Sequence, residues 1–278
     1  MSDKSSVPLP QDTSLFEHQI AGHVHGNKKT KLGLLRHTDG SVLKPIIKDD
    51  ERTVRELKFY ERLFHSKELP PHLRPLRGFV PMYRGVWNAV VDGENVQYIK
   101  LEDMTAGFRR PCALDVKIGA RTYDPFASPE KIALEEGKYP WSRKLGYRIL
   151  GMKVYDKSSN EYKFFDKKFG LKQTPDTVAD AFRTFLRKTK DSPGSPDPLA
   201  EILLHLRQME NWFESQQTLA FYSSSILVVY EGSEVEVGEE PRCAVKMIDF
   251  AHTYEVDQQD DNYLFGLQNF ILVLEQIL

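Results

Sequence analysis

The chain has 278 residues, of which 40% are hydrophobic and 28% charged, and its formal net charge at pH 7 is −2. This composition excludes collagen-like, intrinsically disordered and disulfide-scaffold proteins, and the length allows one large domain or two lobes with a substantial core. The two cysteines form no C-x-x-C pair, so neither a zinc site nor a disulfide framework is predicted. No apolar run reaches the roughly 18 residues of a membrane-spanning helix, and no signal peptide is indicated. We therefore expect a cytoplasmic and/or nuclear protein.

Charge is distributed unevenly along the chain. Residues 138–172 carry ten Lys and Arg against three acidic residues, whereas residues 231–261 carry ten acidic residues against two basic ones. Two interpretations stay open: both segments form solvated faces, or an anion-binding side lies next to a metal-binding side.

The first part of the chain predicts a small lobe. Residues 1–14 are polar and rich in Pro and Ser, and we expect them to form a disordered arm before a lobe over 15–103. The Asp39-Gly40 pair lies between two short apolar runs and predicts a hairpin. The expected elements are a hairpin over 32–35 and 42–47, a helix with Val54, Leu57 and Phe64, and strands over 79–87 and 96–103.

Residues 104–278 predict a larger lobe of mixed helices and strands. A helix is expected to begin at Ser128-Pro129-Glu130, because Ser caps helices, Pro fits the first position and Glu suits the first turn. Another helix is expected after Thr174, where apolar residues recur at helical spacing, with a break at 191–198. The other expected elements are strands over 112–118, 147–155, 221–230 and 243–250, and helices over 199–213 and around 264–274. The whole chain is therefore predicted to be α+β.

The segment 111–119 (PCALDVKIG) places two charged side chains in an apolar strand. Asp115 and Lys117 are two residues apart and so share one face of the strand. Burying charge is costly unless the charges are paired or used. The segment is therefore either a structural ion pair at a strand end or part of a functional site.

Two further positions suggest a nucleotide and a metal. An apolar strand ends at Asp249, where a carboxylate suits magnesium held against phosphates, although Asp also ends strands simply as a turn former. Lys44 on a strand followed by Glu56 on a helix matches the pair with which protein kinases hold ATP phosphates, although a surface lysine is the alternative.

Several common signatures are absent from the sequence. It contains no G-x-x-x-x-G-K-[ST], G-x-G-x-x-G, H-R-D or D-F-G, so P-loop NTPases, Rossmann enzymes and ordinary protein kinases are not supported. No helix interleaves basic and aromatic residues in a way that predicts specific nucleic-acid binding.

Residues 111–119 fit P-x-x-x-D-x-K-x-G, and the chain therefore resembles the inositol polyphosphate kinase family. The following segment, 120–132 (ARTYDPFASPEKI), resembles the multikinase branch of that family. The resemblance runs in order along nearly the whole chain. It also includes HQIAGH at 18–23, GSVLK at 40–44, RELKFY at 55–60, LED at 101–103, SSSILVVYEG at 223–232 and MIDFAH at 247–252.

The resemblance implies a two-lobed ATP-grasp fold, similar to protein kinases, with a short inositol-binding segment at about 120–146. It implies ATP and Mg²⁺ as cofactors. It implies phosphorylation of inositol 1,4,5-trisphosphate and then of the tetrakisphosphate to the pentakisphosphate. Because the segment is short, the resemblance also allows phosphatidylinositol bisphosphate headgroups at a membrane surface. A monomer without a specific nucleic-acid partner is expected.

The resemblance also implies roles for residues on the nucleotide side. Lys44 would hold the ATP phosphates, and the backbone of Glu102 and Met104 would contact adenine. Asp249 would ligate magnesium, with Asp115 close to the nucleotide.

On the substrate side, the resemblance implies that Asp115 orients the inositol hydroxyl and accepts its proton. Lys117 would neutralise charge on the transferred phosphoryl group and on the substrate. The residues implied to contact substrate phosphates are Arg52, Lys131, Lys138 and His252.

A non-catalytic inositol-phosphate-binding scaffold on the same fold is the alternative from another class. Its signature would be the loss of a catalytic residue. Lys44, Asp115, Lys117 and Asp249 are all present in this sequence, which favours an enzyme.

Overall fold

A computed structural model describes residues 8–20, 25, 32–186, 198–233 and 242–278. Its strands are β1 (Thr13–Leu15), β2 (Leu35–His37), β3 (Val42–Ile46), β4 (Tyr83–Val91), β5 (Glu94–Leu101), β6 (Pro111–Ile118), β7 (Tyr147–Asp156), β8 (Glu161–Phe165), β9 (Leu219–Phe221), β10 (Ser225–Glu231), β11 (Cys243–Ile248) and β12 (Thr253–Glu255). Its helices are α1 (Glu51–His65), η1 (Pro71–Leu73), α2 (Leu76–Phe79), α3 (Pro129–Gly137), α4 (Ser142–Leu145), α5 (Lys167–Lys172), α6 (Val178–Leu186), α7 (Leu199–Ser215) and α8 (Asp261–Glu275).

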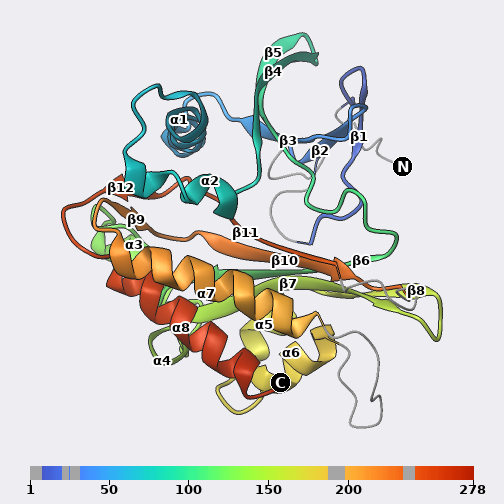
Figure 1. Cartoon of the computed structure of the whole chain (residues 1–278). Helices are drawn as coiled ribbons and strands as arrows, with labels where there is room; N and C mark the ends of the chain where they lie inside the picture. The colour runs from blue at the N-terminus through green and yellow to red at the C-terminus, as the bar shows by residue number, and fades with distance from the viewer. Residues whose placement is uncertain (1–7, 21–24, 26–31, 187–197, 234–241) are drawn as a thin grey trace.

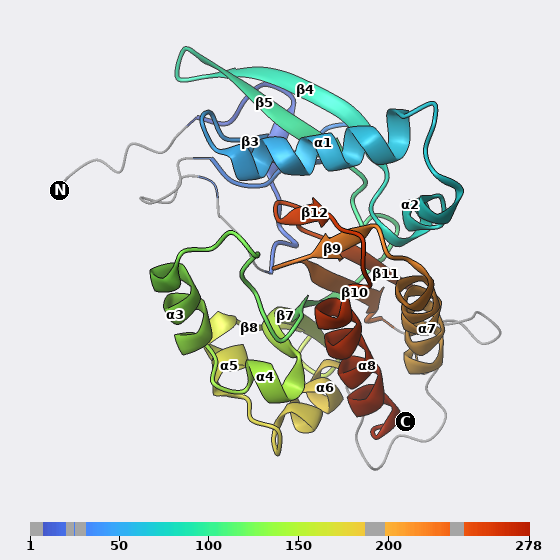
Figure 2. The same ribbon diagram turned by 90° about the vertical axis from the view of Figure 1, so that its left-hand side faces the viewer.

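The first sheet is antiparallel, with the strand order β1-β2-β3-β5-β4. Helix α1 packs against β3 and β4 and lies across this sheet in Figure 2. Asp50 caps α1 by accepting a hydrogen bond from the backbone N–H of Arg52. The residues that α1 buries are Glu56, Phe59, Tyr60 and Leu63. One buried residue of the helix is therefore a carboxylate, which needs a partner.

The second sheet is also antiparallel and has the order β11-β10-β6-β7-β8. Figure 1 shows α5 to α8 below it and the first sheet above it. Strand β6 lies at the centre, with β10 and β7 as neighbours, and its residues are buried except for the half-buried Lys117. This central, buried position explains why the sequence of β6 is almost entirely apolar.

Glycines allow the end of β6 to pack closely against α8. Gly119 has a φ of +107°, and its N–H donates to the carbonyl of Gly146 at 2.7 Å. A Cβ on Gly266 of α8 would lie 2.1 Å from that same carbonyl oxygen and 2.7 Å from the nitrogen of Gly119. The backbone after the P-x-x-x-D-x-K-x-G segment is therefore fixed by a contact that no side chain could occupy.

The predicted α+β class is confirmed, as are the hairpin at Asp39-Gly40 and the helix that begins after Ser128. Ser128 accepts a hydrogen bond from the N–H of Lys131, as expected of a cap. The single strand predicted over 221–230 is wrong, because β9 and β10 are separate strands. Between them Ser223 has a φ of +61°, which breaks the extended backbone.

Three other boundaries also differ from the sequence predictions. Phe79 ends α2, and the strand expected from that residue begins at Tyr83. The helix expected after Thr174 begins at Val178, because residues 174–177 form a turn first. The disordered arm predicted for 1–14 is wrong at Thr13 and Ser14, which pair with β2 as part of β1. Residues 1–7, the break at 191–197 and residues 234–241 of the acidic segment lie outside the described residues.

We propose to keep the lobe boundary between residues 103 and 104, because the first sheet ends at Leu101 and the second begins at Pro111. Among the described helices, none has the length and apolar character needed to cross a bilayer.

The substitution Gly266→Ala is expected to destabilise the protein. The new methyl group would overlap the Gly146 carbonyl, and overpacking of this kind costs about 1–3 kcal/mol. Thermal unfolding measures the effect. Gly78→Ala is the matched control, because a Cβ there meets nothing within 4 Å. Equal unfolding temperatures for the two variants would contradict the close contact.

Candidate functional site

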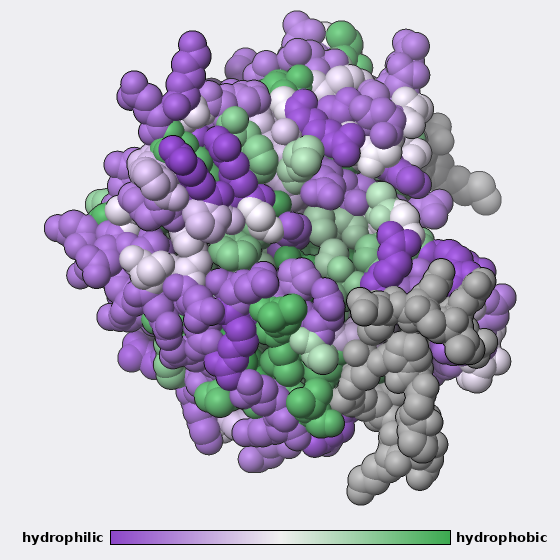
Figure 3. Space-filling model, viewed as in Figure 1, coloured by the Kyte–Doolittle hydropathy of each residue, from purple (hydrophilic) through white to green (hydrophobic). Residues whose placement is uncertain are grey.

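A cavity lies between the two sheets and receives side chains from both. Its charged lining consists of Lys44, Glu56, Glu102, Asp115 and Asp249. Its apolar lining includes Leu34, Val42, Pro81, Leu101, Met104, Ala113, Leu227 and Ile248. In Figure 3, apolar surface is visible in the recess between the upper and lower parts of the molecule. The cavity thus combines apolar walls with a charged end, which suits a ligand that has an aromatic part and an anionic part.

Lys44 on β3 links two carboxylates from distant parts of the chain. Its Nζ donates to Glu56 Oε1 at 2.8 Å and to Asp249 Oδ1 at 2.6 Å. Burial alone would lower the pKa of Lys44, but Asp249 and Glu56 outweigh this and raise it. Lys44 is therefore a fixed positive charge inside the cavity and not a surface lysine.

Asp249 follows β11 in a left-handed conformation, with a φ of +65°. Asp tolerates this conformation better than most residues. The hydroxyl of Ser224 donates to the Asp249 carbonyl at 2.8 Å and holds the turn. The side chain of Asp249 is 42% exposed, so its carboxylate is accessible from the cavity.

Asp115 lies on the central strand β6 and is only 4% exposed. Within the described part of the chain, its Oδ1 has no hydrogen-bond partner. Burial, followed by the nearby charge of Asp249, raises the pKa of Asp115 to about 7. Two neighbouring carboxylates, one with an unsatisfied buried oxygen, fit a divalent cation with a preference for oxygen ligands.

Glu102 and Met104 lie in the connection between β5 and β6 and line the same cavity beside its apolar walls. Two hydrogen bonds hold Glu102 to Met82. Its N–H donates to the Met82 carbonyl at 2.9 Å, and its carboxylate accepts from the Met82 N–H at 3.0 Å. The connection between the lobes is thereby anchored.

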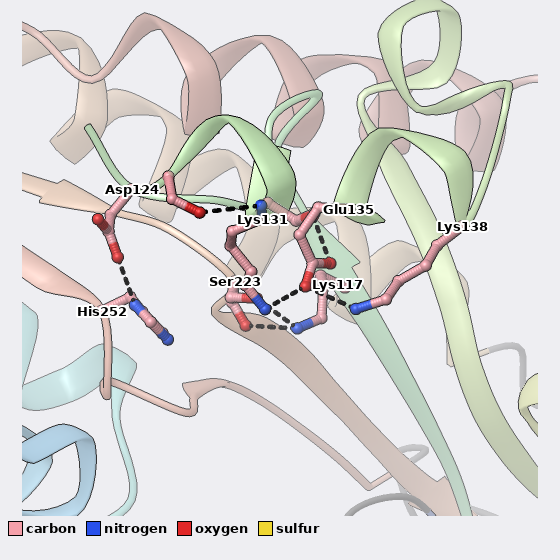
Figure 4. A network of polar contacts seen from close by, with 9 residues as sticks. Lys117, Asp124, Lys131, Glu135, Lys138, Ser223 and His252 are labelled. Carbon is pink, nitrogen blue, oxygen red and sulfur yellow. Dashed lines mark hydrogen bonds and ion pairs between the residues drawn. The ribbon is translucent and has the colours of Figure 1, made fainter. Parts of the chain in front are cut away.

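A second group of charged residues lies around Glu135, outside the lining of this cavity, and is drawn in Figure 4. Lys131 and Lys138 each place Nζ 2.6 Å from Glu135 Oε1. Lys117 donates to the carbonyl of Ser223 at 2.9 Å and to its hydroxyl at 2.8 Å. Burial lowers the pKa of Lys117, whereas the charges of Asp249 and Asp115 raise it. Lys117 therefore connects this group electrostatically with the cavity.

His252 and Arg52 make separate contacts. His252 Nδ1 lies 2.8 Å from Asp124 Oδ2, and Arg52 pairs with Asp50 through Nε at 2.9 Å. Burial lowers the pKa of His252 most, Asp124 opposes that shift, and the charge of Arg52 lowers the pKa further. Arg52 is thus within electrostatic range of His252, but neither residue lines the cavity.

Two cations near the site, Arg148 and Lys167, had no role predicted from the sequence. Arg148 on β7 is the register partner of Lys117 on β6 and is buried. Glu135 contributes to the pKa shifts of Arg148 and of Lys167. The basic tract over 138–172 was the only signal in the sequence that pointed to either cation.

A segment near the N-terminus reaches the cavity as well. Phe16, His18, Gln19 and Ile20 belong to its lining. His18 Nδ1 lies 2.8 Å from the Nζ of Lys153 on β7. The HQIAGH segment was part of the family resemblance, but nothing in its sequence predicted that it would line the cavity.

A protein-family model described as inositol polyphosphate kinase matches residues 98–275. The chain is 40% identical to human inositol polyphosphate multikinase over 224 residues, which cover 78% of this chain and 51% of the relative. It is 31% identical to inositol polyphosphate multikinase beta of Arabidopsis thaliana over an alignment of 283 residues. That alignment covers 94% of this chain and 92% of the relative. The chain thus spans about half the length of the human relative.

Two solved structures are similar to this chain. One, titled "Structural Studies and Protein Engineering of Inositol Phosphate Multikinase", has 29% identity and a TM-score of 0.63 over 80% of this chain and 99% of that chain. The other is inositol phosphate multikinase of S. cerevisiae with ADP and Mn²⁺, which has 24% identity and a TM-score of 0.67. The match covers 85% of this chain and 98% of that chain. At that identity the second similarity shows the fold alone. The predicted two-lobed, kinase-like fold is confirmed.

The raised pKa of Asp115 predicts a pH-dependent stability. Between its ordinary pKa of 3.8 and the folded value of about 7, the folded state holds a proton that the unfolded state has lost. The stability that Asp115 contributes is therefore full below pH 3.8 and is lost as the pH rises through about 7. Asp115→Asn should unfold at a higher temperature than the parent chain above pH 7, with a smaller difference toward pH 4. Thermal unfolding from pH 4 to 8 in a chelator checks this, and a difference independent of pH would contradict it.

Proposed function

The chain belongs to the inositol polyphosphate kinase family, and on that premise we propose that it is an ATP- and Mg²⁺-dependent kinase of soluble inositol phosphates. The observation that carries the proposal is the shared cavity. Lys44, Asp115 and Asp249 come from separate parts of the sequence and line one space. Phosphoryl transfer needs positioning and charge neutralisation more than covalent help. Lys44 would neutralise phosphate charge directly and Asp249 through the Mg²⁺ that it would hold, while Asp115 would position the attacking hydroxyl.

The nucleotide would occupy the cavity between the two sheets. The apolar walls beside Glu102 and Met104 would accept adenine, and Lys44 would contact the phosphates. Glu56 is 2% exposed and pairs with Lys44, so it fixes the position of the ammonium group. Asp249, with Asp115 beside it, would hold Mg²⁺, which when bound neutralises charge on the phosphates.

Asp115 would act as the proton acceptor. Its pKa of about 7 lies near physiological pH, where a general base works best. The carboxylate would take the proton of the attacking inositol hydroxyl as the oxygen bonds to the γ-phosphorus, while the bond from that phosphorus to the β,γ-bridging oxygen breaks and ADP leaves. Lys117 would stabilise charge on the transferred group, because its ammonium lies within electrostatic range of both Asp115 and Asp249.

The substrate phosphates would be bound beside the cavity, at Lys117, Lys131, Lys138 and His252, with Arg52 further out. Helix α3, which carries Lys131, has no buried residues. The side chains of Lys131 and Lys138 are 47% and 33% exposed. An open cationic face of this kind supports successive substrates, from inositol 1,4,5-trisphosphate through the tetrakisphosphate to the pentakisphosphate. The same openness supports a phosphatidylinositol bisphosphate headgroup as a further substrate.

The scaffold alternative predicts inositol-phosphate binding without ATP consumption. A scaffold has no need of a partly buried lysine between two carboxylates or of a third carboxylate with an unsatisfied oxygen. We therefore favour the enzyme. A cytoplasmic and/or nuclear location and a monomeric state are part of the proposal, and imaging of the tagged chain and light scattering would test them.

Asp115→Asn is expected to lower the rate of inositol trisphosphate phosphorylation about 10²–10⁴-fold, because the amide cannot accept the hydroxyl proton. The assay uses Mg-ATP with product resolution by position. Asp257→Asn is the control, since Asp257 is an exposed acid that does not line the cavity. Equal rates for the two variants, or no turnover by the parent chain, would refute the proposed function.

The headgroup proposal has its own test. The protein should phosphorylate phosphatidylinositol bisphosphate in phosphatidylcholine vesicles as well as soluble inositol trisphosphate, because both present phosphates to the same exposed lysines. Thin-layer separation of the lipid products measures this. Turnover of the soluble substrate with none of the lipid would remove the lipid from the proposal and leave the kinase in place.

A further inference from the structure

We propose that Glu135 is a specificity-determining residue whose carboxylate takes the position of a phosphate between Lys131 and Lys138 and so disfavours the more highly phosphorylated inositol phosphates. This inference rests on the proposed function, in which the two lysines bind substrate. The inference adds that the protein itself contributes a negative charge to the cationic substrate site.

The geometry follows from helical spacing. Lys131 precedes Glu135 by four residues and Lys138 follows it by three, so all three side chains share one face of the α3 region. Both ammonium groups converge on the same atom, Oε1, at 2.6 Å. Figure 4 shows this convergence beside Lys117. A substrate phosphate bound by both lysines would have to approach this carboxylate.

Glu135 lies deeper than the lysines that it binds. Its side chain is 9% exposed, whereas theirs are 47% and 33% exposed. Burial alone would raise the pKa of Glu135, but the hydrogen bonds from Lys131 and Lys138 prevail and hold it at about 2. The carboxylate is therefore ionised throughout the physiological range, and a substrate cannot meet it in a neutral form.

The charge of Glu135 reaches beyond these two lysines. Burial lowers the pKa of Lys117, Arg148 and Lys167, and the charge of Glu135 opposes that shift in each, so Glu135 is within electrostatic range of all three. Arg148 is buried, and its Nε has no hydrogen-bond partner among the described residues. Glu135 is thus an anion surrounded by five cations, and it lowers the positive potential of the whole group. The penalty on a ligand grows with the number of phosphates that the ligand brings.

A purely structural role for Glu135 is the competing explanation. Ser128 and Pro129 already fix the start of α3, and the two ion partners of Glu135 are partly exposed, where pairs contribute little to stability. A structural role would make substitution equally harmful to all substrates. A specificity role changes the ratio between substrates, which separates the two explanations.

The test compares the full chain with Glu135→Gln, Glu135→Asp and Glu136→Gln. Glutamine keeps an acceptor for the lysines but removes the charge, whereas aspartate keeps the charge. Glu136 is the control, because it lies on the same helix but pairs with Arg143 and Tyr123. Calorimetry gives the affinities for inositol trisphosphate and pentakisphosphate at low and high salt, and kinetics gives the KM for the trisphosphate.

Glu135→Gln should tighten binding of the trisphosphate roughly threefold and of the pentakisphosphate roughly tenfold or more, with a smaller difference in high salt. Glu135→Asp and Glu136→Gln should keep the parental ratio of affinities. An unchanged ratio in Glu135→Gln, or equal weakening for both ligands, would overturn the inference. These outcomes are independent of turnover, so a parent chain that binds both ligands without consuming ATP would refute the kinase and leave this inference testable.

Discussion

The site depends on one partly buried ammonium group held between two carboxylates. Lys44 belongs to the first sheet, and Asp249 follows the last strand of the second, 205 residues later in the sequence. Such a partly buried ion pair gains little net stability, because the desolvation of its charges offsets much of their attraction. Its persistence is therefore better explained by chemistry than by folding. Glu56 accepts from Lys44 and also from the N–H of Phe250, the residue after Asp249, so the same carboxylate orients both ends of the link.

The two aspartates differ in environment, and this difference supports the separate roles proposed for them. Asp115 is fixed on a central strand, shielded from water, and its pKa is raised toward neutrality. Asp249 lies in a turn, is partly exposed and already shares the charge of Lys44. The structure therefore places two residues of the same type in different environments, one on a buried strand and the other in an accessible turn. This difference is consistent with the proposal that Asp115 accepts a proton and Asp249 binds the metal.

The sequence predicted the parts of the site that depend on local patterns. Strand alternation predicted the charged pair in β6, the end of an apolar strand predicted Asp249, and the likeness to the lysine–glutamate pair of protein kinases suggested that Lys44 pairs with Glu56. It could not predict contacts that depend on register or on unusual backbone. The pairing of Lys117 with Arg148 needs the alignment of β6 with β7, and the bonds of Lys117 to Ser223 need a left-handed residue inside a predicted strand. Arg52 was grouped with the substrate lysines, but in the structure its guanidinium pairs with Asp50.

Each charged segment of the sequence contains residues that have different surroundings in the structure. Within the basic tract, Arg148 and Lys167 join Lys138 around Glu135, whereas Lys163 pairs with Asp156 at the far end of the sheet. Within the acidic segment, Asp249 reaches the cavity, while Asp260 caps α8 by accepting from the N–H of Tyr263. The members of each run therefore divide between solvated positions and positions that converge on the cavity or on Glu135, and whether these bind anions and a metal stays a prediction. Because a run of like charge alternates between faces, its function is set by the strand register and helical spacing that select which members converge.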